Sequence, residues 1–181
     1  MARVLTVILT TTLMASPALA KKGKGKKSGG RDLTMESGTV QLGGSGTIDI
    51  FAAGGSTSVG VNLSPSAGYF VADSLEIFGG VDLGVAGGLS SWGLEAGGKY
   101  FIDVKPNWIY AGLGLGYGAV TVPGVNASVN AFTLSPQGGL LLPLGKNVGL
   151  DVGTRIDIAM SGGSTSIAVP LGFLGVQAFF D

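Results

Sequence analysis

The chain has 181 residues, 34 of them glycine, and its eleven basic and eleven acidic residues make up only 12% of it. Ordinary globular proteins carry roughly 25% charged residues, and the regularly recurring apolar and aromatic residues argue against a disordered chain. Cysteine and histidine are absent, which excludes disulfide bonds, thiolate metal sites and the base that most hydrolases use near neutral pH.

The first 20 residues have the pattern of a secretory signal peptide. Arg3 gives the positive start, residues 5–14 are mostly apolar, and Ala18-Leu19-Ala20 matches a small-residue cleavage site. The apolar stretch is too short to cross ~30 Å of hydrocarbon as a helix. We therefore expect export of the chain and cleavage after Ala20.

Residues 21–37 form a basic leader rich in glycine and lysine. Its positive charges all lie in residues 21–31, which contain no acid; they are Lys21, Lys22, Lys24, Lys26, Lys27 and Arg31. Residues 32–181 hold all eleven acids against four bases, so an acidic body follows a basic arm. We expect residues 21–37 to be a disordered periplasmic segment. The alternative is that residues 21–31 contact anionic lipid headgroups or peptidoglycan.

Residues 38–181 are expected to form one β-barrel domain. No stretch here approaches 18 apolar residues, whereas segments of alternating apolar and polar residues recur between turns, as in membrane barrels. The segments are residues 39–53, 56–69, 74–86, 90–102, 108–120, 127–142, 147–160 and 164–180. The sixth and eighth change faces partway, where a β-bulge is expected. The sequence thus predicts an all-β fold, an eight-stranded antiparallel up-and-down transmembrane β-barrel.

The charged residues of these segments are expected to face a narrow lumen. They are Asp49, Glu76, Asp82, Glu95, Lys99, Asp151, Arg155 and Asp157. The rival fold is a soluble lipocalin-like barrel, which would need an outer face with roughly 25–35% charged residues. The segments carry too few charges for that exterior. Within the lumen we expect Lys99 to form an ion pair with Glu95.

The connections and the aromatic residues predict the orientation. Residues 70–74, 103–107 and 143–147 carry Asp, Pro, Asn and Lys and are assigned to periplasmic turns, whereas the Gly- and Ser-rich connections become outer loops. Aromatic residues gather at the periplasmic strand ends, where membrane interfaces favour them. The residues assigned to this interface are Tyr69, Tyr100, Trp108 and Phe180.

Four stretches are similar to the strands and turns of a known family. They are residues 68–75, 97–101, 111–118 and 145–150. Over residues 38–181 the chain resembles the small outer-membrane β-barrel superfamily, which holds outer-membrane protein X and the opacity-type barrels. The resemblance implies an eight-stranded barrel in the outer membrane of a Gram-negative bacterium and no shared active site. Family members usually end in Phe, whereas here Phe180 is followed by Asp181.

Residues 48–61 and 156–169 have closely similar sequences, each with a Gly-Gly turn between two strands. They are expected to be the first and last hairpins, which become neighbours when the barrel closes. One reading has Asp49 and Asp157 hold a divalent cation together. The other is a duplicated hairpin kept for its turn, because calcium prefers six or more oxygen ligands.

The sequence therefore indicates no catalytic residue, cofactor or metal. We expect a non-enzymatic, monomeric outer-membrane barrel with a structural or envelope-integrity role, surrounded by lipid and without a nucleic-acid partner. One alternative is a narrow, weakly cation-selective, porin-like pore, since many inward positions are glycine. Another is surface adhesion, against which the short outer loops argue.

Overall fold

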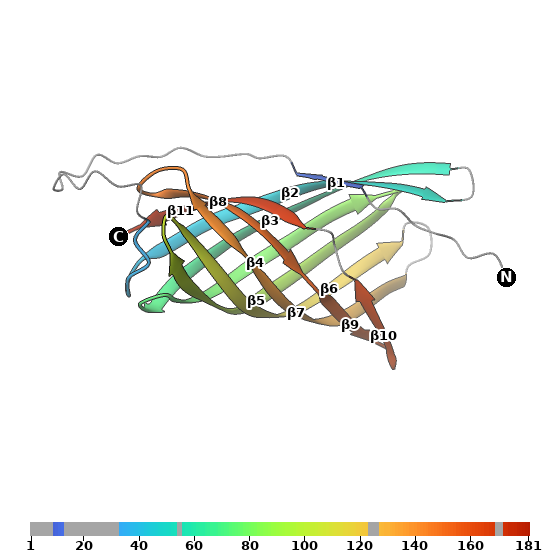
Figure 1. Ribbon diagram of the computed structural model, residues 1–181. Coiled ribbons are helices and arrows are strands. Elements are labelled where there is room, and N and C mark those ends of the chain that lie inside the picture. The colour runs from blue at the N-terminus through green and yellow to red at the C-terminus, as the bar shows by residue number, and fades with distance from the viewer. Residues whose placement is uncertain (1–8, 13–32, 54–55, 123–126, 169–171) are drawn as a thin grey trace.

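The structure of the chain, a computed structural model, consists of β-strands (Figure 1). It describes residues 9–12, 33–53, 56–122, 127–168 and 172–181. The strands are β1 Leu9–Thr12, β2 Val40–Ala53, β3 Ser56–Ala72, β4 Leu75–Ala86, β5 Leu89–Val104, β6 Asn107–Val122, β7 Ala127–Pro143, β8 Val148–Arg155, β9 Asp157–Ser161, β10 Ser164–Ala168 and β11 Phe173–Phe180. Most of the predicted signal peptide and residues 21–32 of the predicted leader lie outside the described residues. No helix in the described part is long and apolar enough to cross a membrane.

Eight strand positions close into a ring. Strands β2 to β8 pair in chain order, β8 pairs with β11, and β11 returns to β2, all antiparallel. The predicted eight-stranded up-and-down barrel is confirmed. The seventh predicted segment is divided at Ile156 into β8 and β9, and the eighth is divided before Phe173 into β10 and β11. The register shift expected in the sixth segment is absent from the β6–β7 ladder, and one occurs instead between Phe70 and Ala72.

The two ends of the barrel differ in their connections. At one end, which we name the hairpin end, Gly87 and Gly88 have φ values of 56° and 81°, and Gly162 and Gly163 have 54° and 84°. Positive φ at both central residues is the geometry of a type I′ turn, which glycine adopts without strain. At the other end, which we name the C-terminal mouth, the turns carry charged and polar residues and lie beside the C terminus.

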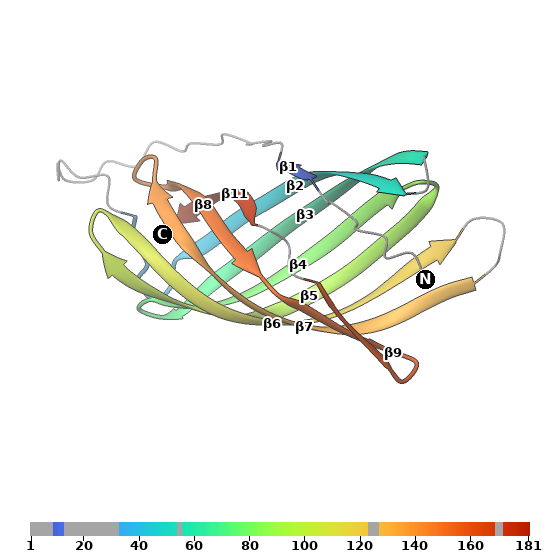
Figure 2. The ribbon, with the colours of Figure 1, turned by 45° about the vertical axis from the view of Figure 1, so that its right-hand side comes forward.

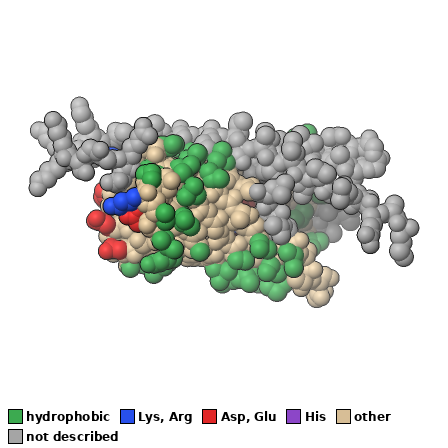
Figure 3. Space-filling view, viewed as in Figure 1, with side chains coloured by type: hydrophobic (Ala, Val, Ile, Leu, Met, Phe, Trp, Pro, Cys, Tyr) green, Lys and Arg blue, Asp and Glu red, His purple; other side chains and the backbone are tan. Residues whose placement is uncertain are grey.

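The alternation along each strand separates an apolar outer wall from a polar interior. On β4, Val81, Leu83 and Val85 are exposed, whereas Asp82 and Gly84 lie on the inner face. Side chains alternate in this way because successive residues of a strand point to opposite faces. Figure 3 shows apolar side chains along the barrel side and the visible acidic and basic groups at the C-terminal mouth.

Residues 33–39, which we name the cap, lie across the C-terminal mouth. Leu33 and Met35 are only 3% and 4% exposed, although this part of the chain belongs to the leader that we expect to be disordered. The Ser74 N–H donates to the Met35 carbonyl (2.8 Å), from a turn in which Ser74 adopts a φ of 64°. The Thr39 hydroxyl donates to Asp181 (3.4 Å), which ties the cap to the C terminus.

Candidate functional site

The barrel lumen is closed at the C-terminal mouth by a layer of apolar side chains. We name this layer the mouth cluster; its members are Leu33, Met35, Phe70, Phe101, Tyr110, Leu141 and Phe179. The Phe70 ring centroid lies 5.5 Å from that of Phe101 and 6.2 Å from that of Phe179, distances typical of favourable ring contacts. Five different strands and the cap thus converge on one packed layer.

Three of the four aromatic residues in the mouth cluster have an outward-facing aromatic neighbour in the sequence. Phe70 is fully buried while Tyr69 is 47% exposed, and the pairs Phe101 with Tyr100 and Phe179 with Phe180 repeat this arrangement. Tyr69, Tyr100 and Phe180 therefore lie on the outer surface near the mouth, where an interface would place them. Trp108 differs from the expectation, because it lies on the inner face of β6 and packs against the mouth cluster.

Above the mouth cluster lies a buried polar layer, which we name the lower network. It consists of Gln41, Glu76, Lys99, Tyr110, Asp151 and Gln177. Asp151 accepts hydrogen bonds from the Tyr110 hydroxyl (2.8 Å) and the Gln177 amide (3.1 Å). The Gln41 amide lies against the side chains of Gln177 and Glu76. Buried charges require such partners, because leaving them unpaired away from water is costly.

Lys99 has a different partner from the one that the sequence suggests. Its Nζ lies 3.9 Å from a Glu76 carboxylate oxygen and over the Phe78 ring, 4.7 Å from the centroid. Glu95, the expected partner, sits four residues away on the same strand, roughly 13 Å along it. Glu76 instead lies directly opposite Lys99 in the β4–β5 register. The ion-pair partner of Lys99 is therefore its neighbour on the adjacent strand, which can be identified only when the strand register is known.

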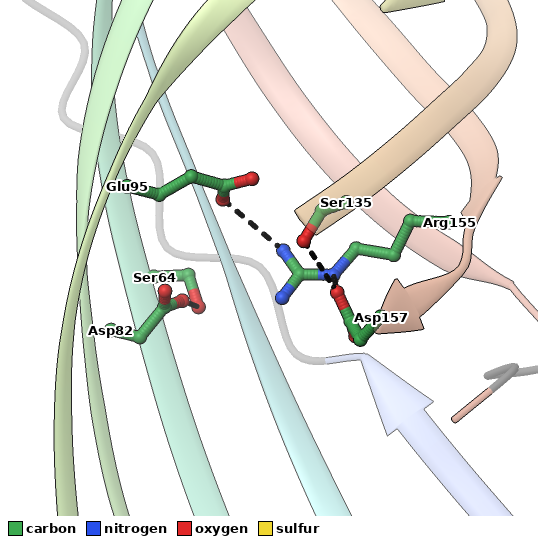
Figure 4. Close-up of polar contacts among 6 residues, drawn as sticks. All are labelled: Ser64, Asp82, Glu95, Ser135, Arg155 and Asp157. Atoms are coloured by element: carbon green, nitrogen blue, oxygen red, sulfur yellow. Dashed lines mark hydrogen bonds and ion pairs between the residues drawn. The ribbon is translucent and has the colours of Figure 1, made fainter. Parts of the chain in front are cut away.

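A second polar layer, the upper network, lies nearer the hairpin end (Figure 4). Its members are Ser64, Asp82, Glu95, Ser135, Arg155 and Asp157. The Arg155 guanidinium reaches Asp157 at 2.9 Å and Glu95 at 3.4 Å. Ser64 and Ser135 donate hydrogen bonds to Asp82 (2.6 Å) and Asp157 (2.8 Å). Three carboxylates face one cation, so this part of the lumen is negative.

The inward glycines provide the room that these side chains occupy. A methyl group on Gly114 would collide with the Glu95 carboxylate, and one on Gly68 would collide with that of Glu76. A methyl group on Gly153 would meet the Tyr110 hydroxyl and the Phe173 ring. The space bordered by the lower network and the mouth cluster is too small for a water molecule. The room left by these glycines is thus occupied by side chains from neighbouring strands.

Seven of the eight charged residues assigned to the lumen lie on the inner face in these two networks. The side chain of the eighth, Asp49, lies outside the described part of the chain, so its expected neighbourhood with Asp157 stays a prediction. The basic leader residues 21–31 also lie outside it. Among the described residues no group of three or more acidic side chains is arranged to hold a metal ion.

Sequence reasoning missed part of the lumen. Gln41, Gln177 and Tyr110 occupy inward positions of their strands. The available signal was their alternation with the neighbouring residues Leu42, Ala178 and Ile109, respectively. The burial of the cap had a weaker signal, namely two apolar residues at a spacing of two within a polar leader. In the upper network the hydroxyls of Ser64 and Ser135 donate to carboxylates, and two of the carboxylates in turn bind Arg155.

Comparisons with known proteins support the fold. No known protein family matches the sequence, and no curated protein matches it. The structure is similar to the N-terminal β-barrel domain of Pseudomonas aeruginosa OprF, with a TM-score of 0.59 and 15% identity over 80% of this chain and 98% of that one. It is also similar to Neisserial surface protein A (NspA), with a TM-score of 0.54 and 18% identity over 77% of this chain and 95% of that one. The fold is that of small eight-stranded outer-membrane β-barrels.

Proposed function

We propose that this chain is a non-conducting integral barrel of the bacterial outer membrane with a structural, envelope-integrity role. It is exported through the signal peptide of residues 1–20, and its C-terminal mouth faces the periplasm. The observation that carries the proposal is the filled lumen, in which the mouth cluster and the lower network lie in succession across the barrel. The surrounding lipid is its main partner, and the chain acts as a monomer without catalytic activity.

The filled lumen argues against the porin-like alternative. An ion would have to displace the buried Phe70 and Phe179 side chains and then pass Glu76, which is also fully buried. Interiors of eight-stranded barrels are narrow enough for side chains to fill them. The negative upper network alone would attract cations, but the lower network and the mouth cluster block the lumen between it and the C-terminal mouth.

The hairpin end argues against adhesion and catalysis. Turns such as Gly87-Gly88 and Gly162-Gly163 contain two residues and expose no charged or aromatic anchor. Binding surfaces usually depend on such anchors. With no histidine in the chain, the Ser64 and Ser135 hydroxyls also lack the base that an esterase-like reaction near neutral pH would need.

Planar-bilayer recording tests the closed lumen. The purified protein should give no stepwise conductance, while its unheated gel band migrates differently from the heated one and so shows that the barrel is folded. Stable, cation-selective steps from a folded sample would establish the pore instead. For the envelope role, deletion of the gene should increase sensitivity to detergent and large antibiotics, and re-expression should restore resistance. Unchanged sensitivity would contradict that role.

A further inference from the structure

The polarity of β6 and β7 inverts near the hairpin end. Along most of their length the outward side chains are apolar, as far as the neighbouring aromatic residues Tyr117 and Phe132. Nearer the hairpin end the exposed outward side chains are polar; they are Thr121, Ser128 and Asn130. The β-bulge expected within residues 127–142 would have exchanged the two faces, but the β6–β7 ladder has a continuous register. The inward face at this end is therefore itself apolar.

This apolar inward face is open to solvent. Side chains alternate along a strand, and Val120 lies an even number of residues from the buried Tyr110, as Val129 does from the buried Ser135. The two valines are opposite each other in the ladder and are 40% and 57% exposed. Figures 1 and 2 show β6 and β7 continuing side by side to this end. With the inward Leu89 of β5, we name these residues the outer luminal face; its members are Leu89, Val120 and Val129.

The described lumen is accessible from the hairpin end and closed at the other. The exposed fraction of inward side chains falls from 57% at Val129 to 32% at Arg155 in the upper network, and to zero at Glu76 in the lower network. A solute entering from the hairpin end can thus reach the upper network, and the packed layers below stop it there.

The upper network leaves both room and negative charge at this level. A methyl group on Gly93 would have Asp82 as its nearest neighbour at 3.6 Å, an ordinary contact, whereas one on Gly114 would collide with Glu95. Asp82 accepts a hydrogen bond from Ser64 and is not one of the two carboxylates that Arg155 binds. The Glu95 Oε1 atom is buried and accepts no hydrogen bond from the described residues. Arg155 therefore leaves part of this negative charge uncompensated.

The charge and the apolar face together select a ligand with two parts. A narrow space with one sign of charge and low-dielectric walls concentrates ions of the opposite sign, here cations. Val120 lies opposite Ser91, which is four residues from Glu95 on β5 and so roughly 13 Å along the strand. An alkyl chain attached to a cation beside the upper network would extend along this distance and cover the apolar side chains.

We propose that the hairpin end binds amphiphilic cations, with an ammonium group beside Asp82 and Glu95 and an alkyl chain along the outer luminal face. The inference goes beyond the envelope role, because it assigns a ligand class to a lumen that conducts nothing.

Calorimetric titration tests the site with three probes. The full chain, folded in phosphatidylcholine nanodiscs, is titrated with tetramethylammonium, hexyltrimethylammonium and hexanesulfonate, and titrations of discs without protein are subtracted. Each methylene removed from water strengthens binding about fourfold. Hexyltrimethylammonium should therefore bind at least tenfold more tightly than tetramethylammonium, and also than hexanesulfonate, which has the same chain and the opposite charge.

Four variants locate the two parts of the ligand, each checked for folding by its heat-shifted gel band. Val129→Ser should weaken binding of hexyltrimethylammonium at least threefold and leave tetramethylammonium unchanged. Asp82→Asn should weaken both cations, and so should Gly93→Val, which fills the space without removing a charge. The matched control, Val85→Ser, makes the first substitution on the outer face of β4, where Val85 is 60% exposed, and should change neither.

Three results would overturn the proposal. Equal binding of the ammonium and the sulfonate would show partitioning of the chain alone, and equal binding of the two cations would show a charged lumen without an apolar site. Binding that neither Val129→Ser nor Gly93→Val weakens would lie elsewhere on the protein. Conductance is a separate measurement, so a conducting pore would contradict the proposed function and leave the binding result standing.

Discussion

At the scale of single residues, glycine determines which side chains the lumen can hold. Large inward residues such as Tyr110 and Phe173 pack against positions where a Cβ atom would have no room. The sequence predicts that many inward positions are glycine, but from the sequence alone the resulting space reads as water. The side chains that fill this space come from neighbouring strands, and only the three-dimensional register shows which ones they are.

Gly153→Ala tests this reading. The added Cβ would lie 2.6 Å from a Phe173 ring carbon and 2.8 Å from both the Tyr110 hydroxyl and the Gly138 carbonyl. Overpacking of this kind destabilises by about 1–3 kcal/mol, so the midpoint of urea unfolding in detergent should fall. Gly145→Ala is the control, because no atom lies within 4 Å of its added Cβ. Equal midpoints for both variants and the wild type would contradict a packed lumen.

Arg155→Gln tests the upper network. The substitution removes the positive charge that holds Glu95 and Asp157 and leaves their carboxylates facing one another. Loss of a partly buried, hydrogen-bonded cation should cost about 1–3 kcal/mol, again measured by urea unfolding. The control is Lys105→Gln, which removes an ion pair between Lys105 and Asp103, two side chains that are 80% and 42% exposed. It should change the free energy of unfolding by less than about 1 kcal/mol. A larger loss from Lys105→Gln would refute the distinction.

At the scale of elements, the sequence predicted the features that depend on residues within one segment and missed those that depend on contacts between distant segments. The alternation of β4 over residues 75–86 is contained in the segment itself, and the predicted segment 74–86 differs by one residue. The partner of Lys99 and the burial of the cap depend on residues distant in the chain. The division of the last two predicted segments was not predicted either. At Ile156 the break is slight, because its N–H still donates to the Pro136 carbonyl of β7 (2.9 Å), in register with the pairs on both sides.

The cap should stabilise the barrel, whereas the basic arm before it should not. Replacing both Leu33 and Met35 with alanine removes two buried side chains from the mouth cluster. Each such change typically costs about 2–5 kcal/mol when the cavity cannot collapse, so thermal unfolding of the double variant should occur at a lower temperature. Deletion of residues 21–31 is the control and should leave the unfolding temperature unchanged. The reverse result would show that the arm, and not the cap, supports the barrel.

At the scale of the whole molecule, one physical condition links the two faces of the barrel. A chain with 12% charged residues cannot cover a water-exposed barrel, and its apolar outer wall matches hydrocarbon. The few charged residues of the strands lie inside instead, and the seven that the structure describes there belong to the two networks. Fold class and strand count could be predicted because both follow from this alternation. The networks themselves could not, since they depend on which inward residues the closed ring brings together.

The most direct test of the account is the accessibility of spin labels placed one at a time on β4. Cysteines at residues 81 to 85 of the cysteine-free chain would be labelled in lipid bilayers, and collisions with oxygen, which enriches in hydrocarbon, compared with those of a water-soluble nickel reagent. Labels at Val81, Leu83 and Val85 should meet oxygen most, and those at Asp82 and Gly84 least, with a period of two residues. Water-exposed labels at Val81, Leu83 and Val85, or lipid-exposed ones at Asp82, would contradict the claim that the apolar face meets lipid and the charges lie inside.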